Sequence, residues 1–229
     1  MYKNHAVKCQ EYAMQSANNL MDVAMLVSVS IQQNWLSCGD QLKDVKDNGI
    51  NSKFLWGVKS KTYKYLNSNK HKLYSQVLAI SNSYKSDDDK AYSLMKVFLR
   101  IDGLALVKAG FLCQLTMGLV GCMDVHNIKM YKIDPKTLVL NKNVKTIKGL
   151  ESNKQKIESY IKLCHTYGTE NLWNDWCNNL ATKSKSWRDG NHVSEVHINY
   201  LLGLETAPEN KIERCLQVQK LIQKNNIGR

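Results

Sequence analysis

The stretch Arg100–Tyr131, RIDGLALVKAGFLCQLTMGLVGCMDVHNIKMY, decides the fold that we expect for this chain. A helix ends near Arg100, and the short turn 101–105 contains a glycine. A second, strongly apolar helix is predicted over 106–117, because it has no breaker before the glycines that follow. The pattern therefore predicts two helices joined by a tight turn.

Two ionisable side chains flank this hairpin. The N–H groups at the start of the second helix form a ready site for a phosphate, and Gly103 would let the backbone approach a DNA strand closely. Lys108 lies one turn into the second helix. Asp124 follows after one return crossing and is placed to cap a further helix from about Val125. A lysine and a carboxylate could therefore meet at the mouth of a cleft.

This stretch resembles the helix-hairpin-helix DNA glycosylases, which carry a hairpin of the form LPGxGxK followed by A, and later a V-D-x-H motif. The matching residues are Ile101-Asp102-Gly103-Leu104-Ala105, Lys108-Ala109 and Cys122-Met123-Asp124-Val125-His126. The resemblance covers roughly thirty of the 229 residues. Asp102 stands in place of the usual proline, Ala105 in place of the second glycine, and one extra residue precedes Lys108.

The resemblance implies an activity and a set of contacts. Lys108 would attack C1′ of a damaged nucleoside and form a Schiff base, and Asp124 would assist departure of the base. An amine attacks only when neutral, and the base must first leave the helix stack. The predicted DNA contacts of the hairpin and the later motif are Gly103, Leu104, Ala105, His126 and Asn127. Alternatively, Lys108 contacts phosphate or solvent, Asp124 is a plain N-cap, and His126 and Asn127 make structural hydrogen bonds.

The charge of the chain favours a polyanionic partner. Its formal net charge is +12, and nearly all of the positive charge is lysine. Nucleic acid is the commonest partner of such a surface, and anionic membrane is the next. Alternatively, the lysine excess only reflects an AT-rich genome. Segment 51–72 has six lysines, no acid and four interleaved aromatics. These aromatics either stack on bases or are buried. The lysines predicted to contact DNA are Lys59, Lys61, Lys64, Lys129 and Lys132.

Few breakers elsewhere predict an all-α chain, with only two prolines in 229 residues. We expect one long helix over 6–33, mostly loop over 37–50 and a helix over about 88–100. Four further helices are expected over about 152–165, 170–182, 192–204 and 209–224. The whole chain, 1–229, would form a single domain with two helical lobes around a cleft, its helix-hairpin-helix region at about 88–130.

Several classes of protein lack support. Seven widely spaced cysteines without a CxxC argue against a disulfide framework, a zinc site and an iron–sulfur cluster. His192, Glu195 and His197 lack the spacing of a metal site, so we expect no metal and no cofactor. No phosphate-binding or dinucleotide-binding glycine motif occurs. The apolar run Leu20–Ile31 is too short to span a bilayer, and no signal peptide is visible.

The sequence therefore predicts a DNA glycosylase, with possible AP-lyase activity through Lys108. One alternative is a DNA base-modifying transferase on the same fold, since this fold also serves enzymes that modify thymine in phage DNA. Another is a non-catalytic DNA-binding or virion-associated phage protein, since the runs GLxLVKAGF and DxHN are similar to those of uncharacterised phage proteins. The expected partner is double-stranded DNA, not membrane, bound by a monomer in the cytoplasm (the host cytoplasm for a phage protein).

Overall fold

The computed structural model describes residues 3–31, 37–141, 143–183 and 202, and the regular elements in these ranges are all helices, with no strand among them. The all-α prediction is therefore confirmed for the described ranges. The α-helices are α1 (Lys3–Ala13), α2 (Ala17–Val29), α3 (Cys38–Asn48), α4 (Val58–Ser81), α5 (Asp87–Phe98), α6 (Leu106–Thr116), α7 (Val125–Met130), α8 (Ile147–Glu151), α9 (Lys154–Tyr167) and α10 (Thr169–Lys183). Among the described elements, the short 3-10 helices are η2 (Gly49–Asn51) and η3 (Pro135–Leu138).

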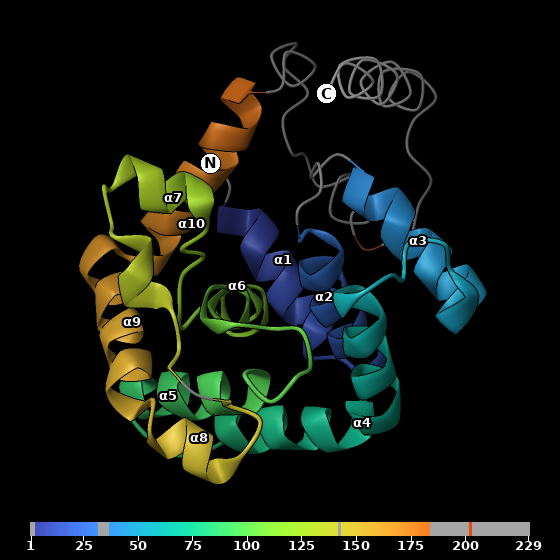
Figure 1. Cartoon of the computed structure of the whole chain (residues 1–229), viewed down its shortest axis with the longest axis horizontal. Helices are drawn as coiled ribbons and strands as arrows, with labels where there is room; N and C mark the ends of the chain where they lie inside the picture. The colour runs from blue at the N-terminus through green and yellow to red at the C-terminus, as the bar shows by residue number, and fades with distance from the viewer. Residues whose placement is uncertain (1–2, 32–36, 142, 184–201, 203–229) are drawn as a thin grey trace.

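Helix α6 lies in the middle of the molecule, where Figure 1 shows it end-on with other helices around it. Nine of its 11 residues are buried, as expected for a helix that is apolar on all sides. It packs against α1, α2 and α5. On α9, Tyr160 lies so close that a Cβ on Gly110 would clash with its hydroxyl. Helix α6 is therefore the core element that carries Lys108.

The predicted single helix over 6–33 is wrong, because the structure has two helices, α1 and α2, separated by a turn at 14–16. Ser16 causes the break. Its backbone is extended, and its side chain caps α2 by accepting a hydrogen bond from the Asn19 N–H at 3.1 Å. Leu20, Val23 and Val27 lie on one face of α2 at helical spacing, and all three are fully buried.

The predicted loop over 37–50 is also wrong, since α3 occupies most of it. Its glycine, Asp and Asn residues are typical of loops. However, Cys38, Leu42 and Val45 recur at helical spacing and are all buried, so packing overrides the weak local preference.

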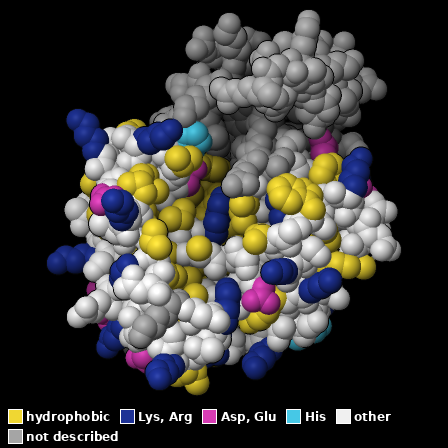
Figure 2. Space-filling model, in the orientation of Figure 1, with side chains coloured by type: hydrophobic (Ala, Val, Ile, Leu, Met, Phe, Trp, Pro, Cys, Tyr) yellow, Lys and Arg dark blue, Asp and Glu magenta, His cyan; other side chains and the backbone are white. Residues whose placement is uncertain are grey.

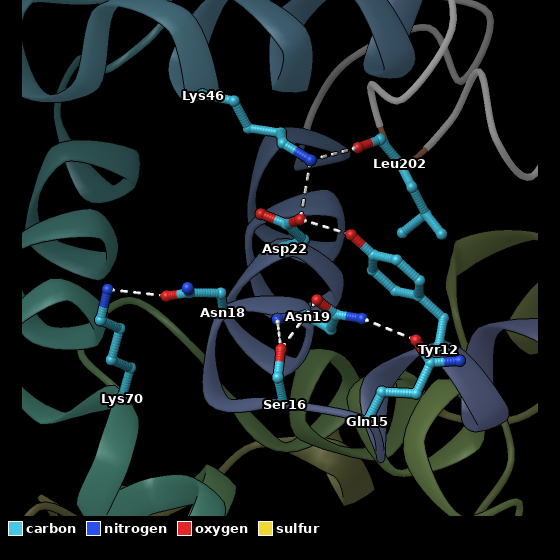
Figure 3. A network of polar contacts seen from close by, with 9 residues as sticks. All are labelled: Tyr12, Gln15, Ser16, Asn18, Asn19, Asp22, Lys46, Lys70 and Leu202. Atoms are coloured by element: carbon cyan, nitrogen blue, oxygen red, sulfur yellow. Dashed lines mark hydrogen bonds and ion pairs between the residues drawn. The ribbon is translucent and has the colours of Figure 1, made fainter.

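A polar network joins the first three helices (Figure 3). The hydroxyl of Tyr12 donates to Asp22 Oδ2 at 2.7 Å, and Lys46 of α3 pairs with the same oxygen at 2.8 Å. Burial raises the pKa of Tyr12, and the bond to Asp22 adds to that shift. The network fixes α3 against α1 and α2.

The remaining predicted helices follow the sequence closely. Helices α5, α6, α9 and α10 begin and end within a few residues of the predicted bounds. Ser86 caps α5 through a hydrogen bond from the Asp89 N–H at 3.2 Å. The predicted helices 192–204 and 209–224 lie outside the described residues, as do His192, Glu195 and His197. No helix in the described ranges is long and apolar enough to cross a membrane.

Gly103 forms the turn of the α5–α6 hairpin with a φ of +85°. A Cβ at this position would lie 2.9 Å from Val58 Cγ1 and 3.1 Å from the Val58 carbonyl oxygen. The first turn of α4 therefore packs directly on the hairpin, and Thr62 Oγ1 donates to the Asp102 carbonyl at 2.7 Å.

Gly103→Ala is expected to lower the free energy of unfolding by about 1–3 kcal/mol, because alanine meets both the positive φ and the contact with Val58. Urea unfolding of the two proteins would measure the difference. Gly57→Ala provides a matched control, since Gly57 also has a positive φ (+55°) but a Cβ there would meet nothing within 4 Å. Equal losses in both variants would show that the contact with Val58 contributes nothing.

Candidate functional site

Lys108 lies half-buried in the first turn of α6, as the sequence predicts. Its ammonium donates to the Ser30 hydroxyl at 2.9 Å, which connects it to the end of α2. It also lies over the ring of Phe111, 5.2 Å from the ring centroid. The side chain is thus held in a defined position between a polar and an aromatic neighbour.

Asp124 caps α7, so its predicted position at a helix start is confirmed. Its Oδ1 accepts the backbone N–H groups of His126 at 2.9 Å and Asn127 at 3.3 Å. Its Oδ2 accepts the indole N–H of Trp176 in α10 at 2.7 Å. Both carboxylate oxygens are therefore acceptors, and three donors fix the orientation of the group.

The two candidate residues flank one aromatic cluster. Phe111, which carries Lys108 over its face, packs edge-on against Trp176 with ring centroids 5.0 Å apart. Trp176 in turn holds Asp124. Both residues also act on one thiol: burial raises the pKa of Cys122 well above its usual value, Asp124 adds to the rise and Lys108 opposes it. The structure therefore brings Lys108 and Asp124 to the same part of the molecule.

Lys59 does not occupy the solvated position that a simple phosphate contact suggests. It is only 2% exposed, and its ammonium lies 5.0 Å from the ring centroid of Trp56. Burial lowers its pKa, Cys38 opposes that shift and Lys108 adds to it. The first turns of α3, α4 and α6 thus place Cys38, Lys59 and Lys108 close enough to affect one another.

The other predicted contacts divide into exposed and buried positions. Ala105, Lys61, Lys64, Lys129 and Lys132 are exposed, and Gly103 and His126 are partly exposed. Figure 2 shows a face on which hydrophobic side chains gather in the middle, with Lys and Arg side chains spread around them. The exposed and partly exposed residues named above are accessible to a nucleic acid.

Leu104 and Asn127 are buried, at 3% and 0% exposure, so neither presents its side chain to a ligand. The amide of Asn127 donates to the carbonyls of Cys122 at 2.6 Å and Leu172 at 2.8 Å. Asn127 therefore joins α7 to α10, which is the structural alternative that its place at a helix start allowed. Leu104 anchors the hairpin in the core.

The aromatic residues are mostly structural. Trp173 and Trp176 are each 4% exposed and belong to the core. In segment 51–72, Tyr63 and Tyr65 pack against the core, whereas Trp56 is 54% exposed. Of the two alternatives for this segment, burial applies to the tyrosines, and Trp56 stays accessible for stacking.

Lys145 is a contributor that the sequence alone did not reveal. Its ammonium donates to the carbonyls of Leu99 at 2.8 Å, Leu104 at 3.4 Å and, at shorter range, Ile101. Burial lowers its pKa, and Asp102 opposes that shift. Lys145, which follows η3 in the chain, therefore connects the hairpin turn to a later part of the structure. The general excess of lysine in the sequence did not distinguish Lys145 from the other lysines.

The cysteines of the described ranges are buried and form no disulfide. Burial raises the pKa of Cys38 to about 12 in spite of two nearby lysines. Cys113 and Cys164 are fully buried, as expected for small hydrophobic residues. Cys215 lies outside the described residues. The described thiols are thus core groups rather than nucleophiles.

Two open pockets lie elsewhere. One, of about 610 Å³ between α5 and α9, is lined by both acidic and basic side chains. The other, of about 420 Å³, lies beside the network of Figure 3. Lys46 and Lys70, which line the second pocket, already bond to Asp22 and Asn18. Both pockets lie apart from Lys108 and Asp124.

Comparison with known proteins yields no relative: the chain matches no protein-family model, and no curated protein or solved structure is significantly similar to it.

Proposed function

We propose that this chain binds double-stranded DNA and removes a base extruded from the duplex, as a DNA glycosylase of the helix-hairpin-helix type. The observation that carries the proposal is the arrangement around Phe111 and Trp176. Lys108 lies over one ring, Asp124 accepts a hydrogen bond from the other, and the α5–α6 hairpin precedes Lys108 directly. An amine and a carboxylate at the end of a DNA-binding hairpin suit attack on a nucleoside.

The chemistry assigns a step to each residue. After losing a proton, the Lys108 amine attacks C1′, and the electron pair of the C1′–N bond leaves with the base, which takes up a proton. The sugar ring then opens to an imine between Lys108 and C1′. Asp124, held in place by hydrogen bonds at both oxygens, would supply the negative charge that stabilises the positive charge developing on the sugar.

The charge distribution supports the partner. Net charge is +12, and four predicted contacts, Lys61, Lys64, Lys129 and Lys132, are exposed. If these lysines contact four phosphates, affinity should fall about a hundredfold when salt rises fourfold. Fluorescence anisotropy of a labelled duplex would measure this slope. An affinity that does not change with salt concentration would show that the basic surface does not bind DNA.

Borohydride trapping tests the activity. The purified protein is mixed with duplexes that contain an abasic site, 8-oxoguanine, uracil, thymine glycol or hydroxymethyluracil. We expect a covalent adduct on at least one duplex, and its loss in Lys108→Gln, because only an imine is reduced to a stable bond. Lys162→Gln provides the control, since Lys162 is exposed on α9 and far along the chain from the hairpin.

The other outcomes have distinct meanings. Base release without an adduct would indicate a glycosylase that uses water instead of Lys108. No adduct and no base release, with binding intact, would overturn the proposal in favour of a base-modifying transferase or a non-catalytic DNA-binding protein.

A further inference from the structure

A cavity of about 420 Å³ lies where α2, α3 and α4 meet. Pockets that bind small molecules are commonly of about 300–1,000 Å³ and are mostly apolar, with a few polar groups that orient the ligand. The apolar lining here comes from Met21 and Met25 of α2 and from Leu42 and Val45 of α3. Met25, Leu42 and Val45 are at most 2% exposed, so the floor of the cavity is part of the hydrophobic core.

Helix α4 contributes a polar wall to the same cavity. Tyr63, Asn67 and Lys70 line it, and their spacing of four and three residues places them on one face of the helix. In the described part of the chain, the Tyr63 hydroxyl and the Asn67 side-chain amide make no hydrogen bond. Each of these groups can both donate and accept. The wall therefore has hydrogen-bonding capacity that the described residues do not use.

The charged side chains of the lining leave one positive charge uncompensated. Asp22 and Lys46 form an ion pair at 2.8 Å, as Figure 3 shows, and so neutralise each other. Lys70 donates instead to the side-chain oxygen of Asn18 at 2.8 Å, which is a neutral acceptor. Among the described residues, no carboxylate lies within ion-pair distance of Lys70. The lining therefore carries a net positive charge on its polar wall.

We propose that this cavity binds a small aromatic molecule with one negative charge, whose ring lies on Met21 and Met25 and whose anionic group pairs with Lys70. Methionine side chains adapt to the shape of a ligand and make favourable contacts with aromatic rings. A neutral ligand would leave the charge of Lys70 without a counterion, and a second negative charge would have no free cation in the lining. The inference goes beyond base excision, because neither Lys108 nor Asp124 lines the cavity.

Two dyes with nearly the same ring system test the site. Anilinonaphthalene sulfonate carries one negative charge, whereas N-phenylnaphthylamine lacks the sulfonate and is neutral. Fluorescence titration of the folded wild-type protein should show one saturable site for the sulfonate, with a lower Kd than for the neutral dye. Lys70→Met should raise the Kd of the sulfonate about tenfold, because a charged hydrogen bond is lost, and leave the Kd of the neutral dye unchanged.

The matched control is Lys72→Met. Lys72 is an exposed lysine of the same helix and does not line the cavity, so its replacement should leave both Kd values unchanged. An equal loss in Lys70→Met and Lys72→Met would show that only the net charge attracts the dye, and it would overturn the site. The absence of a saturable site in the wild type would overturn it as well.

A third variant tests where the dye binds. Asn67 is exposed at the edge of the cavity, so Asn67→Trp should fold normally, fill part of the space and abolish the binding of both dyes. Unchanged dye binding in Asn67→Trp, with far-UV circular dichroism like that of the wild type, would place the dye elsewhere and reject the proposal. Lys108→Gln should bind both dyes as the wild type does, and a loss in this variant would also reject the proposal.

Discussion

Asp124→Ala should lower the free energy of unfolding by about 2–5 kcal/mol, which is the loss of a helix cap together with an unpaired indole N–H. The carboxylate accepts three hydrogen bonds, two from the start of α7 and one from Trp176. Trp176 is 4% exposed, so water cannot replace its lost acceptor fully. Urea unfolding followed by far-UV circular dichroism would measure the loss.

Two variants divide this loss into its parts. Asp124→Ser keeps an acceptor for the cap but cannot reach Trp176, so we expect a loss of about 1–3 kcal/mol. Trp176→Phe removes the donor instead. The effects of Asp124→Ser and Trp176→Phe should be less than additive in the double variant, because the two residues share one bond. A change below about 0.5 kcal/mol in Asp124→Ala would contradict the structural role.

These variants also bear on catalysis. Asp124→Ser retains the start of α7 but removes the negative charge. If Asp124 stabilises positive charge on the sugar, Asp124→Ser should lower base release at a temperature where it remains folded. Unchanged base release would show that Asp124 acts only as the cap of α7.

Lys145→Met should lower the free energy of unfolding by about 2–4 kcal/mol, because the hairpin carbonyls lose a charged donor. Leu99 and Ile101 are fully buried, so their carbonyl oxygens have little access to water. The hairpin turn should also lose its defined shape, and duplex affinity should fall with it. Lys148→Met removes the same charge at an exposed position, so it should change affinity only slightly.

The pH dependence of this difference has a definite sign. Burial lowers the pKa of Lys145, so the folded state binds its proton less tightly than the unfolded state. The contribution of Lys145 to stability therefore rises with pH between the lowered pKa and about 10.4, the usual value for lysine. The gap in stability between wild type and Lys145→Met should widen over that alkaline range. A gap that narrows there would show that Lys145 is not buried in the folded state.

The features that the sequence predicted correctly are those that depend on local signals. The glycine turn before Leu106, the apolar run of α6 and the cap at Asp124 each depend on residues within a few positions of one another. The same local reasoning failed at Ser16 and over α3. At Ser16 one side-chain hydrogen bond divides a continuous apolar pattern into two helices, and in α3 burial of Leu42 and Val45 outweighs residues that favour loops.

The sequence by itself determined the helical class, the α5–α6 hairpin and the cap at Asp124, because periodicity and capping act within one or two helical turns. Only the tertiary structure decided that Lys59 is buried with no hydrogen bond to its ammonium in the described ranges, that Lys145 binds the hairpin 41 to 46 residues away, and that Trp176 holds Asp124 across 52 residues. From the sequence alone, a lysine is expected to lie at the surface with its charge in solvent. Whether it is solvated, paired or left unpaired depends on which distant helices pack around it.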